Sequence, residues 1–302
     1  MAVLTGKAVV ITGSGRGIGA ACAKGAAREG AAVVVNDIDA GPASETVEAI
    51  KAAGGTAIAC VADITDWDEA GRLIQSCIDA FGKIDGLVNN AALFHSARLE
   101  ATDPKAARAL VDVNVIGPLY TTGHAIKPML AQNFGSIVNV VSGAHMGMEG
   151  MDIYGATKGA VASMTYTWAL ELKDTGVRVN GLSPFGATRM MGGQGMSEED
   201  AAKRLAQLPP AEQNSPVVEF LLSDLSKDVH GQLIRIDREE VYLYTHPALL
   251  VPPAVRPKWS AEALADAFAN EFKGRQVGCG VLGMENGPVD LKSGYWSRAK
   301  AS

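Results

Sequence analysis

The amino-acid sequence predicts an α/β protein in which a doubly wound, seven-stranded parallel sheet is followed by a C-terminal extension. Short runs rich in valine and isoleucine alternate with longer segments of helical period, as in parallel sheets covered by helices on both faces. A glycine-rich turn follows the first such run, and the second run ends in an acidic residue. Right-handed crossovers between consecutive strands then give the doubly wound arrangement.

The alternation places strands and helices in turn along the chain. Strands are expected at residues 8–12, 32–37, 57–62, 86–89, 136–141, 177–182 and 232–236. Helices are expected at residues 17–29, 43–53, 66–81, 104–132, 154–173 and 217–223.

The chain divides into a main domain, residues 1–240, and an extension, residues 241–302. Within the main domain, a segment at about 186–216 is rich in Met, Gly, Pro and polar residues, with helical period only at 198–208. It is interpreted as a substrate loop, either a mobile lid or a surface loop with a short helix. The extension carries too many aromatic and apolar residues for a solvated linker, so we expect it to pack on the core as part of the same domain. It would cover the substrate entrance, an oligomer interface or only the outer face of the sheet.

Composition and charge exclude several classes of function. The net charge of -6 lacks the basic excess that nucleic acids attract. No apolar run reaches the roughly 18 residues of a membrane span, and the first residues lead directly into a strand, so we expect a cytoplasmic protein without a membrane partner. The cysteines and histidines lack metal-ligand spacing, so no metal site is expected.

The first glycine-rich turn has the composition of a dinucleotide-binding loop. Glycines let the backbone approach a pyrophosphate, whose charge is met by free N–H groups at the start of the following helix. The residues expected to contact the nucleotide here are Gly13, Ser14, Arg16, Gly17, Ile18 and Gly19.

The acid at the end of the second strand predicts which nucleotide binds. Asp37 follows the glycines by about 20 residues, where a carboxylate accepts hydrogen bonds from the ribose hydroxyls of NAD. The same carboxylate would repel the 2′-phosphate of NADP, so NAD is the expected cofactor. Asp39 is an alternative ligand, and Asp37 could instead only cap a turn.

An ordered set of motifs resembles the short-chain dehydrogenase/reductase family, whose members have the Rossmann fold. The set covers residues 7–189 and comprises Thr12-Gly-Ser-Gly-Arg-Gly-Ile-Gly19, Asn89-Asn-Ala-Ala92, Asn114, Ser142 and Tyr154-Gly-Ala-Thr-Lys158. The resemblance implies an oxidoreductase with Asn114, Ser142, Tyr154 and Lys158 as its catalytic residues. Ser142 would hydrogen-bond the substrate oxygen, and Asn114 would hold a water that links Lys158 to solvent. Each of the three side chains around Tyr154 could also have only a structural role.

The chemistry of Tyr154 and Lys158 supports this resemblance independently. The two residues lie four apart at the start of a predicted helix, so their side chains share a face. A tyrosine with a pKa near 10 must lose about three units to act near neutrality, which is about 4 kcal/mol. One cation at about 4 Å supplies a comparable energy at an effective dielectric of about 20. We therefore expect Lys158 and the nicotinium charge to lower the pKa of Tyr154.

The resemblance also implies further contacts with the nucleotide, including contacts from Tyr154 and Lys158 themselves. These contacts are assigned to Asp63, Ile64, Asn90, Ala91, Pro184, Gly186 and Thr188. The chain departs from the family pattern at Ala92 and Phe185, where glycine is usual, and in the strand that ends at Asp237, where Asp-Gly-Gly is common. Phe185 could form an apolar wall beside the nicotinamide. The candidates for the substrate pocket are His95, His145, Met148, Phe185 and Met190, of which the histidines could be surface loop residues and the methionines core residues.

The predicted function is that of an NAD(H)-dependent oxidoreductase that interconverts a secondary alcohol and a ketone, with Tyr154 as the acid/base. The substrate would be a small molecule with apolar character. The alternatives are a lyase or epimerase on the same scaffold and a non-catalytic NAD-binding regulatory protein. The resemblance implies a homo-oligomer, a tetramer or dimer, formed through the helical segments 104–132 and 154–173.

Overall fold

The computed structural model describes residues 2–187, 197–247, 249, 252–273, 289–290 and 297–298. The chain forms two compact units, Met1–Tyr244 and Thr245–Ser302. Thr188 and Met190, which the sequence assigned to the cofactor and the substrate, lie outside the described residues.

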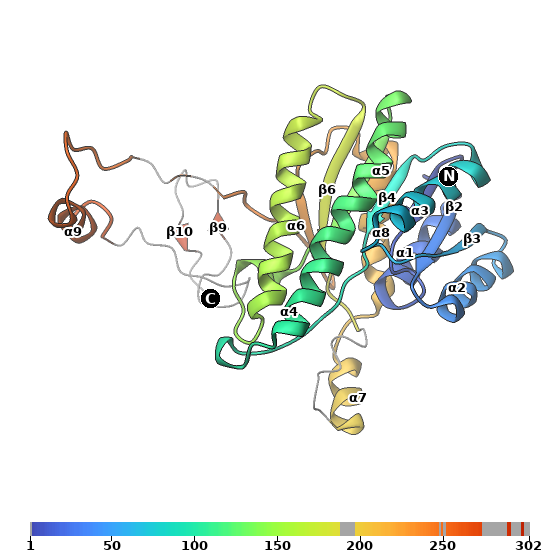
Figure 1. The fold of residues 1–302 in the computed structure, drawn as a ribbon, viewed down its shortest axis with the longest axis horizontal. Helices are drawn as coiled ribbons and strands as arrows, with labels where there is room; N and C mark the ends of the chain where they lie inside the picture. Colours follow the sequence, from blue (N-terminus) through green and yellow to red (C-terminus); the bar gives the residue numbers. More distant parts are fainter. Residues whose placement is uncertain are drawn as a thin grey trace. The chain divides into compact units, whose positions relative to one another are not determined.

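The first unit is built on a sheet with strand order β3-β2-β1-β4-β5-β6-β7-β8 (Figure 1). Its strands are β1 (Ala8–Ile11), β2 (Ala32–Asp37), β3 (Thr56–Val61), β4 (Gly86–Asn89), β5 (Gly135–Val140), β6 (Val177–Ser183), β7 (Leu233–Asp237) and β8 (Glu240–Leu243). The pairs among β1–β7 are parallel, which confirms the doubly wound parallel sheet predicted from the sequence. The order reverses between β1 and β4, where sheets of this type bind ligands at the carboxyl ends of their strands.

The eighth strand was not predicted. β8 pairs antiparallel with β7, and the turn between them joins Asp237 to Glu240 with Arg238 at a φ of +55°. Short hairpin turns usually contain glycine or asparagine, and this turn has neither. The predicted boundary at residue 240 therefore falls at the first residue of a strand of the main sheet, and the structural boundary follows Tyr244.

Helices cover the sheet on both faces. They are α1 (Gly17–Arg28), α2 (Ala40–Ala52), α3 (Trp67–Phe81), α4 (Pro104–Val111), α5 (Gly117–Ala131), α6 (Asp152–Glu171) and α8 (Ser215–Leu222). A further helix, α7 (Glu198–Ala206), belongs to the segment between β6 and α8. Figure 1 views the sheet from the side of α4, α5 and α6. The alternating side chains of the strands supply a separate core for each face.

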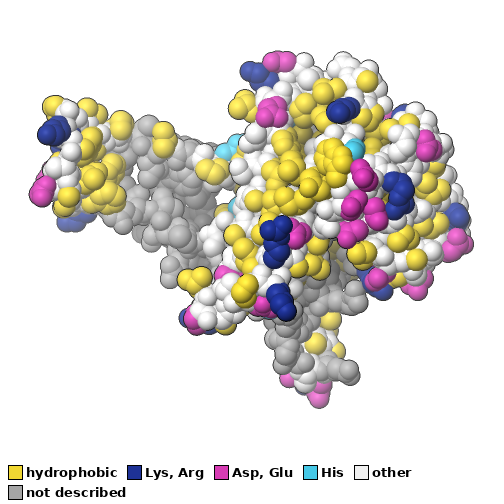
Figure 2. Space-filling view, viewed as in Figure 1, with side chains coloured by type: hydrophobic (Ala, Val, Ile, Leu, Met, Phe, Trp, Pro, Cys, Tyr) yellow, Lys and Arg dark blue, Asp and Glu magenta, His cyan; other side chains and the backbone are white. Residues whose placement is uncertain are grey.

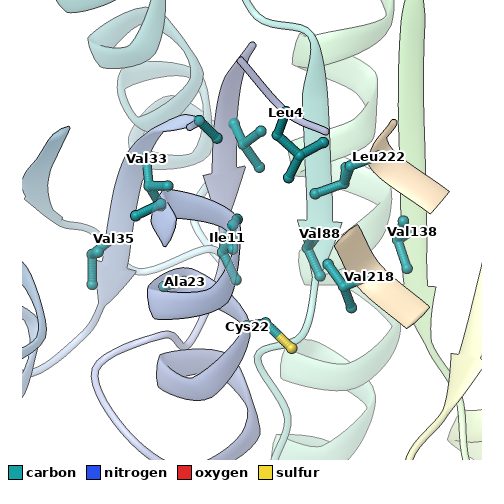
Figure 3. Close-up of a cluster of buried hydrophobic side chains, with 14 of the residues drawn as sticks. Leu4, Ile11, Cys22, Ala23, Val33, Val35, Val88, Val138, Val218 and Leu222 are labelled. Atoms are coloured by element: carbon teal, nitrogen blue, oxygen red, sulfur yellow. The ribbon is translucent and has the colours of Figure 1, made fainter. Parts of the chain in front are cut away.

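The core between the sheet, α1 and α8 is shown in Figure 3. Ile11 and Val33 from the strands meet Cys22 and Ala23 of α1 and Leu222 of α8, all of them almost fully buried. Burial raises the pKa of the Cys22 thiol to about 12, so this cysteine remains a neutral apolar side chain. Alanines on α1 let the helix lie close to the glycine loop that precedes it.

The segment expected as one helix, residues 104–132, is interrupted. A single π-helical turn, Asp112–Ile116, separates α4 from α5, and the buried Asn114 lies in it. Such turns insert one extra residue into a helix and are frequent at functional sites. Hydrophobic period alone could not reveal this turn, because it leaves the apolar pattern on either side almost unchanged.

The second unit contains α9 (Ala261–Ala269) and an antiparallel pair of short strands, β9 (Val289–Asp290) and β10 (Ser297–Arg298). Arg256 forms ion pairs with Asp266, at 3.2 Å, and with Glu271. The rings of Phe268 and Phe272 pack edge to face at 5.2 Å. This unit therefore has its own internal contacts, and its packing on the main sheet stays a prediction.

Candidate active site

The glycine loop after β1 is shaped by two residues with left-handed backbone. Gly13 and Gly17 have φ values of +59° and +56°, which residues with a Cβ rarely adopt. Space is equally restrictive, because a Cβ on Gly13 would lie 2.7 Å from Ala91 Cα and one on Gly19 would lie 2.4 Å from Asn90 Nδ2. The sequence therefore has glycine where the loop must lie against the strand end that carries Asn90 and Ala91.

Thr12 and Asn90 hold these two segments together. The Thr12 hydroxyl accepts hydrogen bonds from the backbone N–H groups of Asn90 and Ala91, both at 3.0 Å. The Asn90 side chain donates to the carbonyl oxygens of Thr12 and Gly13, both at 2.9 Å. Because both donors of the Asn90 amide are used within the protein, these contacts favour a structural role for the side chain. The backbone at this position could still contact a nucleotide.

Asp37 faces the glycine loop from the end of β2. Its Oδ2 accepts a hydrogen bond from Gly15 N–H at 3.1 Å, and its Oδ1 accepts one from Asp39 N–H at 3.2 Å. The carboxylate is thus held in one orientation. Beside it, Arg16 forms an exposed ion pair with Asp39 at 2.8 Å.

A cleft of about 560 Å³ opens along the start of α1. It is lined by Gly15, Arg16, Gly17, Ala20, Ala21, Lys24, Glu45, Thr46, Ala187, Pro210, Ala211 and Glu212. The glycine loop and the free N–H groups of the first turn of α1 fit the pyrophosphate of a dinucleotide in this cleft. Ser14 lies in the same loop and donates its hydroxyl to the carbonyl oxygen of Ile11 at 2.7 Å, and Ile18 lies in the first turn of α1.

Asp63 and Ile64 follow β3 on the same edge of the sheet. Asp63 Oδ1 accepts hydrogen bonds from both the backbone N–H and the hydroxyl of Thr65, at 2.9 and 2.8 Å. Ile64 is buried, and a Cβ on Gly117 would come within 2.4 Å of its Cδ1. Gly117 therefore lets the first turn of α5 pack over the strand end that carries Asp63.

Asn114 links three segments around the candidate catalytic residues. Its Oδ1 accepts from Leu93 N–H at 2.7 Å, and its Nδ2 donates to Leu93 O at 3.0 Å and to the hydroxyl of Thr157 at 3.1 Å. The side chain is thus fully used within the protein. Thr157 precedes Lys158 on α6, so Asn114 fixes the part of that helix that carries the lysine.

Tyr154 and Lys158 lie one turn apart on α6, as their spacing predicted. The Lys158 ammonium lies 5.9 Å from the centre of the Tyr154 ring and donates to the carbonyl oxygen of Val140 at 2.8 Å. Ser142 lies two residues beyond Val140, and its Oγ accepts a hydrogen bond from Ala144 N–H at 3.2 Å. Ser142, Tyr154 and Lys158 therefore meet at the carboxyl end of β5.

In the protein alone, burial opposes the lowering of the pKa of Tyr154 that is expected from Lys158 and the nicotinium charge together. Burial raises the pKa of Tyr154, and the hydrogen bond from Ser142 only partly offsets this effect. Burial likewise lowers the pKa of Lys158, to about 8. The sequence argument placed a cation near the hydroxyl but left out the cost of removing both charged forms from water.

His145, Tyr244 and Ser183 form a side-chain wall beside Ser142. His145 Nδ1 is hydrogen-bonded to the carbonyl oxygen of Ser142, and burial lowers the pKa of its imidazole. Its ring lies 5.1 Å from that of Tyr244, whose hydroxyl lies 3.0 Å from Ser183 Oγ. Tyr244 and Ser183 were missed by the sequence analysis, since no motif marks them and Tyr244 comes after the unpredicted strand.

Phe94 lies against Tyr154, and the other described candidates for the substrate pocket lie in the loops after β4, β5 and β6. The Phe94 ring packs edge-on against the Tyr154 ring at 5.0 Å and was also missed. Met148 and His95 are partly buried in the loops after β5 and β4. In the loop after β6, Phe185 donates its N–H to Asn214 Oδ1 at 3.1 Å, and Pro184 and the buried Gly186 flank it.

No cluster of three or more His, Cys, Asp or Glu side chains in the described parts of the chain is arranged to hold a metal ion. None of the described helices combines the length and the apolar character needed to cross a bilayer.

The glycine loop at the sheet's reversal point and the Ser, Tyr and Lys side chains beside it define a Rossmann-fold oxidoreductase that binds a nicotinamide nucleotide. The chain belongs to the short-chain dehydrogenase family, whose model matches residues 7–199. An uncharacterised oxidoreductase of Methylorubrum extorquens is 38% identical over 78% of this chain and 97% of its own. A 3-oxoacyl-[acyl-carrier-protein] reductase of Thermotoga maritima is 34% identical over 78% of this chain and 97% of its own.

A crystal structure of a short-chain dehydrogenase from Mycobacterium avium superposes with a TM-score of 0.81 and 31% sequence identity. The match covers 93% of this chain and 99% of that one. Because the match covers more than the part of the chain before Thr245, it extends into the C-terminal unit.

Proposed function

We propose that the protein is an NAD(H)-dependent dehydrogenase that interconverts a secondary alcohol and a ketone. The observation that carries the proposal is the position of the buried Lys158 ammonium, 5.9 Å from the centre of the Tyr154 ring and hydrogen-bonded to Val140 O, two residues before Ser142. The reductase of Thermotoga maritima named above acts on a 3-oxoacyl group, so a related protein carries out chemistry of this class. None of the contacts described above favours a lyase, an epimerase or a regulatory protein.

The roles of the residues follow from their positions. In the oxidative direction, Ser142 and Tyr154 hydrogen-bond the substrate hydroxyl, and Tyr154 accepts its proton as the carbon–oxygen double bond forms. The glycine loop would hold NAD, which would supply the hydride acceptor for the same carbon. Lys158 stabilises the negative charge on Tyr154, and the reverse sequence reduces a ketone. A bound oxidised nicotinamide would supply a further positive charge, which would oppose the rise in the pKa of Tyr154 caused by burial.

The choice of NAD rests on two aspartates. Both oxygens of Asp37 are oriented by backbone N–H groups and face the glycine loop, where ribose hydroxyls can donate to their remaining lone pairs. Arg16, a cation that could otherwise meet a 2′-phosphate, is ion-paired with Asp39 at 2.8 Å. A phosphate placed here would face two carboxylates, which disfavours NADP.

We propose that the protein assembles as a homo-oligomer, a tetramer or dimer, in the cytoplasm. Figure 2 shows hydrophobic side chains gathered on the face of the sheet that α4, α5 and α6 cover. Leu119 and Leu130 of α5 and Leu170 of α6 are exposed, and Trp67 is 48% exposed. A closed assembly would remove such side chains from water. Light scattering at micromolar concentration tests this part, and a monomer would contradict it.

A panel of secondary alcohols tests the reaction. Purified protein is mixed with each alcohol and with NAD or NADP, and formation of the reduced nucleotide is followed by its absorbance. Turnover of at least one secondary alcohol with NAD, in preference to a primary alcohol of the same carbon skeleton, is the expected result. Turnover of primary alcohols alone, or the absence of nucleotide reduction with the whole panel and of nucleotide oxidation with the matching ketones, would contradict the proposal.

A further inference from the structure

Two arginines meet one aromatic ring at the carboxyl end of β7. The guanidinium carbons of Arg235 and Arg238 lie 5.3 and 5.7 Å from the centre of the Phe185 ring. The two side chains differ sharply in exposure, at 12% for Arg235 and 61% for Arg238. A guanidinium withdrawn from water in this way is unfavourable unless its donors find acceptors.

The donors of Arg235 are only partly used. One Nη donates to Asp237 Oδ2 at 3.0 Å, and Arg238 donates to the other oxygen of the same carboxylate, also at 3.0 Å. The Nε of Arg235 is buried and has no hydrogen-bond partner among the described residues. A guanidinium recognises a carboxylate or phosphate through two parallel N–H donors, so an unused Nε leaves the group able to take an anion.

The charges around the ring leave one positive charge uncompensated. Asp237 is shared by two arginines, and the neighbouring acids Glu239 and Glu240 are exposed on the turn. Glu240 accepts a hydrogen bond from the Tyr242 hydroxyl. Exposed carboxylates are screened by water and salt, whereas the buried guanidinium is not.

Arg235 lies on the wall that begins at the catalytic serine. Ser183 is its register partner on β6 and lies beside the Tyr244 hydroxyl, whose ring neighbours His145. Arg235 lies two residues after Leu233 on β7, so the two side chains point to the same face of the sheet. Leu233 packs with Val141 and Val161 on the α6 side. The unused donor is therefore on the same face of the sheet as Ser142 and Tyr154.

We infer that Arg235, stacked on Phe185, binds an anionic group of the substrate while the reacting carbon lies at Ser142 and Tyr154. The shared chemistry is that of a carboxylate, a sulfonate or a phosphate monoester on an otherwise apolar skeleton. This inference rests on the proposed function, because it assigns the far end of the same substrate. The competing interpretation is that Arg235 only braces the hairpin of β7 and β8 through Asp237.

Binding of simple anions to the full-length protein saturated with NADH tests the inference without turnover. Isothermal titration compares hexanoate, hexanesulfonate and hexyl phosphate with neutral hexanamide. At least one anion should bind about tenfold more tightly than hexanamide, the effect of a hydrogen bond between charged groups. The identity of the preferred anion separates the three sources.

Variants test whether Arg235 is the residue that causes the preference for an anion over hexanamide. Arg235→Met should reduce the affinity for the preferred anion to that for hexanamide, Arg235→Lys should restore part of it, and neither should change the binding of hexanamide. The matched control is Arg238→Met, which removes the exposed arginine on the same ring and the same carboxylate. It should change the affinity by less than about threefold, as expected for a largely solvated charge.

Two results would overturn the inference. One is equal affinity of the wild-type protein for all four compounds, including no measurable binding of any of them, and this comparison needs no variant to fold. The other is an anion preference that survives in Arg235→Met with an unchanged unfolding temperature. Failure of the proposed function looks different, because anions would still bind through Arg235 while no secondary alcohol or ketone in the panel reacts.

Discussion

The nucleotide half and the substrate half of the molecule are built in different ways. Around β1, α1 and β2, the site is formed largely by backbone, with Gly13 and Gly17 in left-handed conformations and Asp37 bonded to backbone N–H groups. Around β6, β7 and β8, it is formed by side chains that come together from distant positions, such as His145, Ser183 and Tyr244. A backbone site needs particular residue types at fixed spacing, whereas a side-chain wall can be built from many combinations.

From this difference we expect the first half to respond to small changes and the second half to tolerate variation. A single added carbon on Gly19 would meet Asn90 at 2.4 Å. On the wall, by contrast, Phe185 replaces the glycine usual in the family, and Arg235 and Arg238 pack on its ring. We therefore expect changes in the first half to alter nucleotide binding and changes in the second to alter substrate choice.

The largest effect is expected at Tyr154, where the two halves meet. Tyr154→Phe removes the hydroxyl that transfers the proton and should lower kcat by about 100- to 10,000-fold. The ring that packs on Phe94 remains, so the affinity for NAD should stay within about threefold. Steady-state kinetics and NADH fluorescence titration measure the two quantities. Near wild-type turnover in this variant would end the proposed mechanism.

Asp37→Ala should change the nucleotide preference without changing the substrate. We expect the wild-type protein to prefer NAD over NADP by about 100-fold or more in kcat/KM, since placing a phosphate beside the carboxylate costs several kcal/mol. The variant should narrow this ratio by at least tenfold and leave the ranking of the alcohols unchanged. Equal use of both nucleotides by the wild-type protein would remove Asp37 as the selecting residue.

Lys158→Ala should move the pH dependence of alcohol oxidation upward. Without the ammonium, the negative form of Tyr154 loses its nearest cation, so the pKa of the tyrosine rises and the ascending limb of kcat should shift by about one unit or more. Initial rates between pH 6 and 11 measure the shift. An unchanged profile would show that Lys158 does not act on Tyr154.

The same lysine has a consequence for stability. Burial lowers the pKa of Lys158 from 10.5 to about 8, so the folded protein binds fewer protons than the unfolded chain between these values. This group should therefore stabilise the fold increasingly as the pH rises through that window, by at most about 3 kcal/mol. Denaturant unfolding at pH 7 and pH 10 should show a smaller increase for Lys158→Met than for the wild-type protein, and an equal increase in both would contradict this sign.

The smallest effect is expected on the substrate wall. Tyr244→Phe removes the hydrogen bond to Ser183 but keeps the ring against His145, so kcat/KM should fall by less than about tenfold. Tyr244→Ala removes both contacts and should change the ranking of the alcohols. Both variants should bind NAD as the wild-type protein does. A loss of NAD affinity in either one would show that the two halves are not separable.

Several features of the protein were determined by the sequence alone. The alternation of apolar runs and helical segments predicted the seven parallel strands, because a strand buried on both faces must be apolar along its length. The spacing of Tyr154 and Lys158 predicted that they share a helix face, because residues four apart lie one turn apart. The glycines predicted a tight loop at β1, because only glycine fits the conformation and the space at Gly13.

Other features were decided only by the tertiary structure. The strand β8 follows a turn that contains no glycine, so no turn motif marks it. The π-helical turn at Asn114 does not change the hydrophobic period of the sequence. Arg235 reaches Phe185 only because β6 and β7 are neighbours in the sheet. The pKa of Tyr154 is raised because burial outweighs the local hydrogen bond. Burial and long-range contacts are properties of the folded chain as a whole, so the local pattern that predicts a helix or a strand cannot predict them.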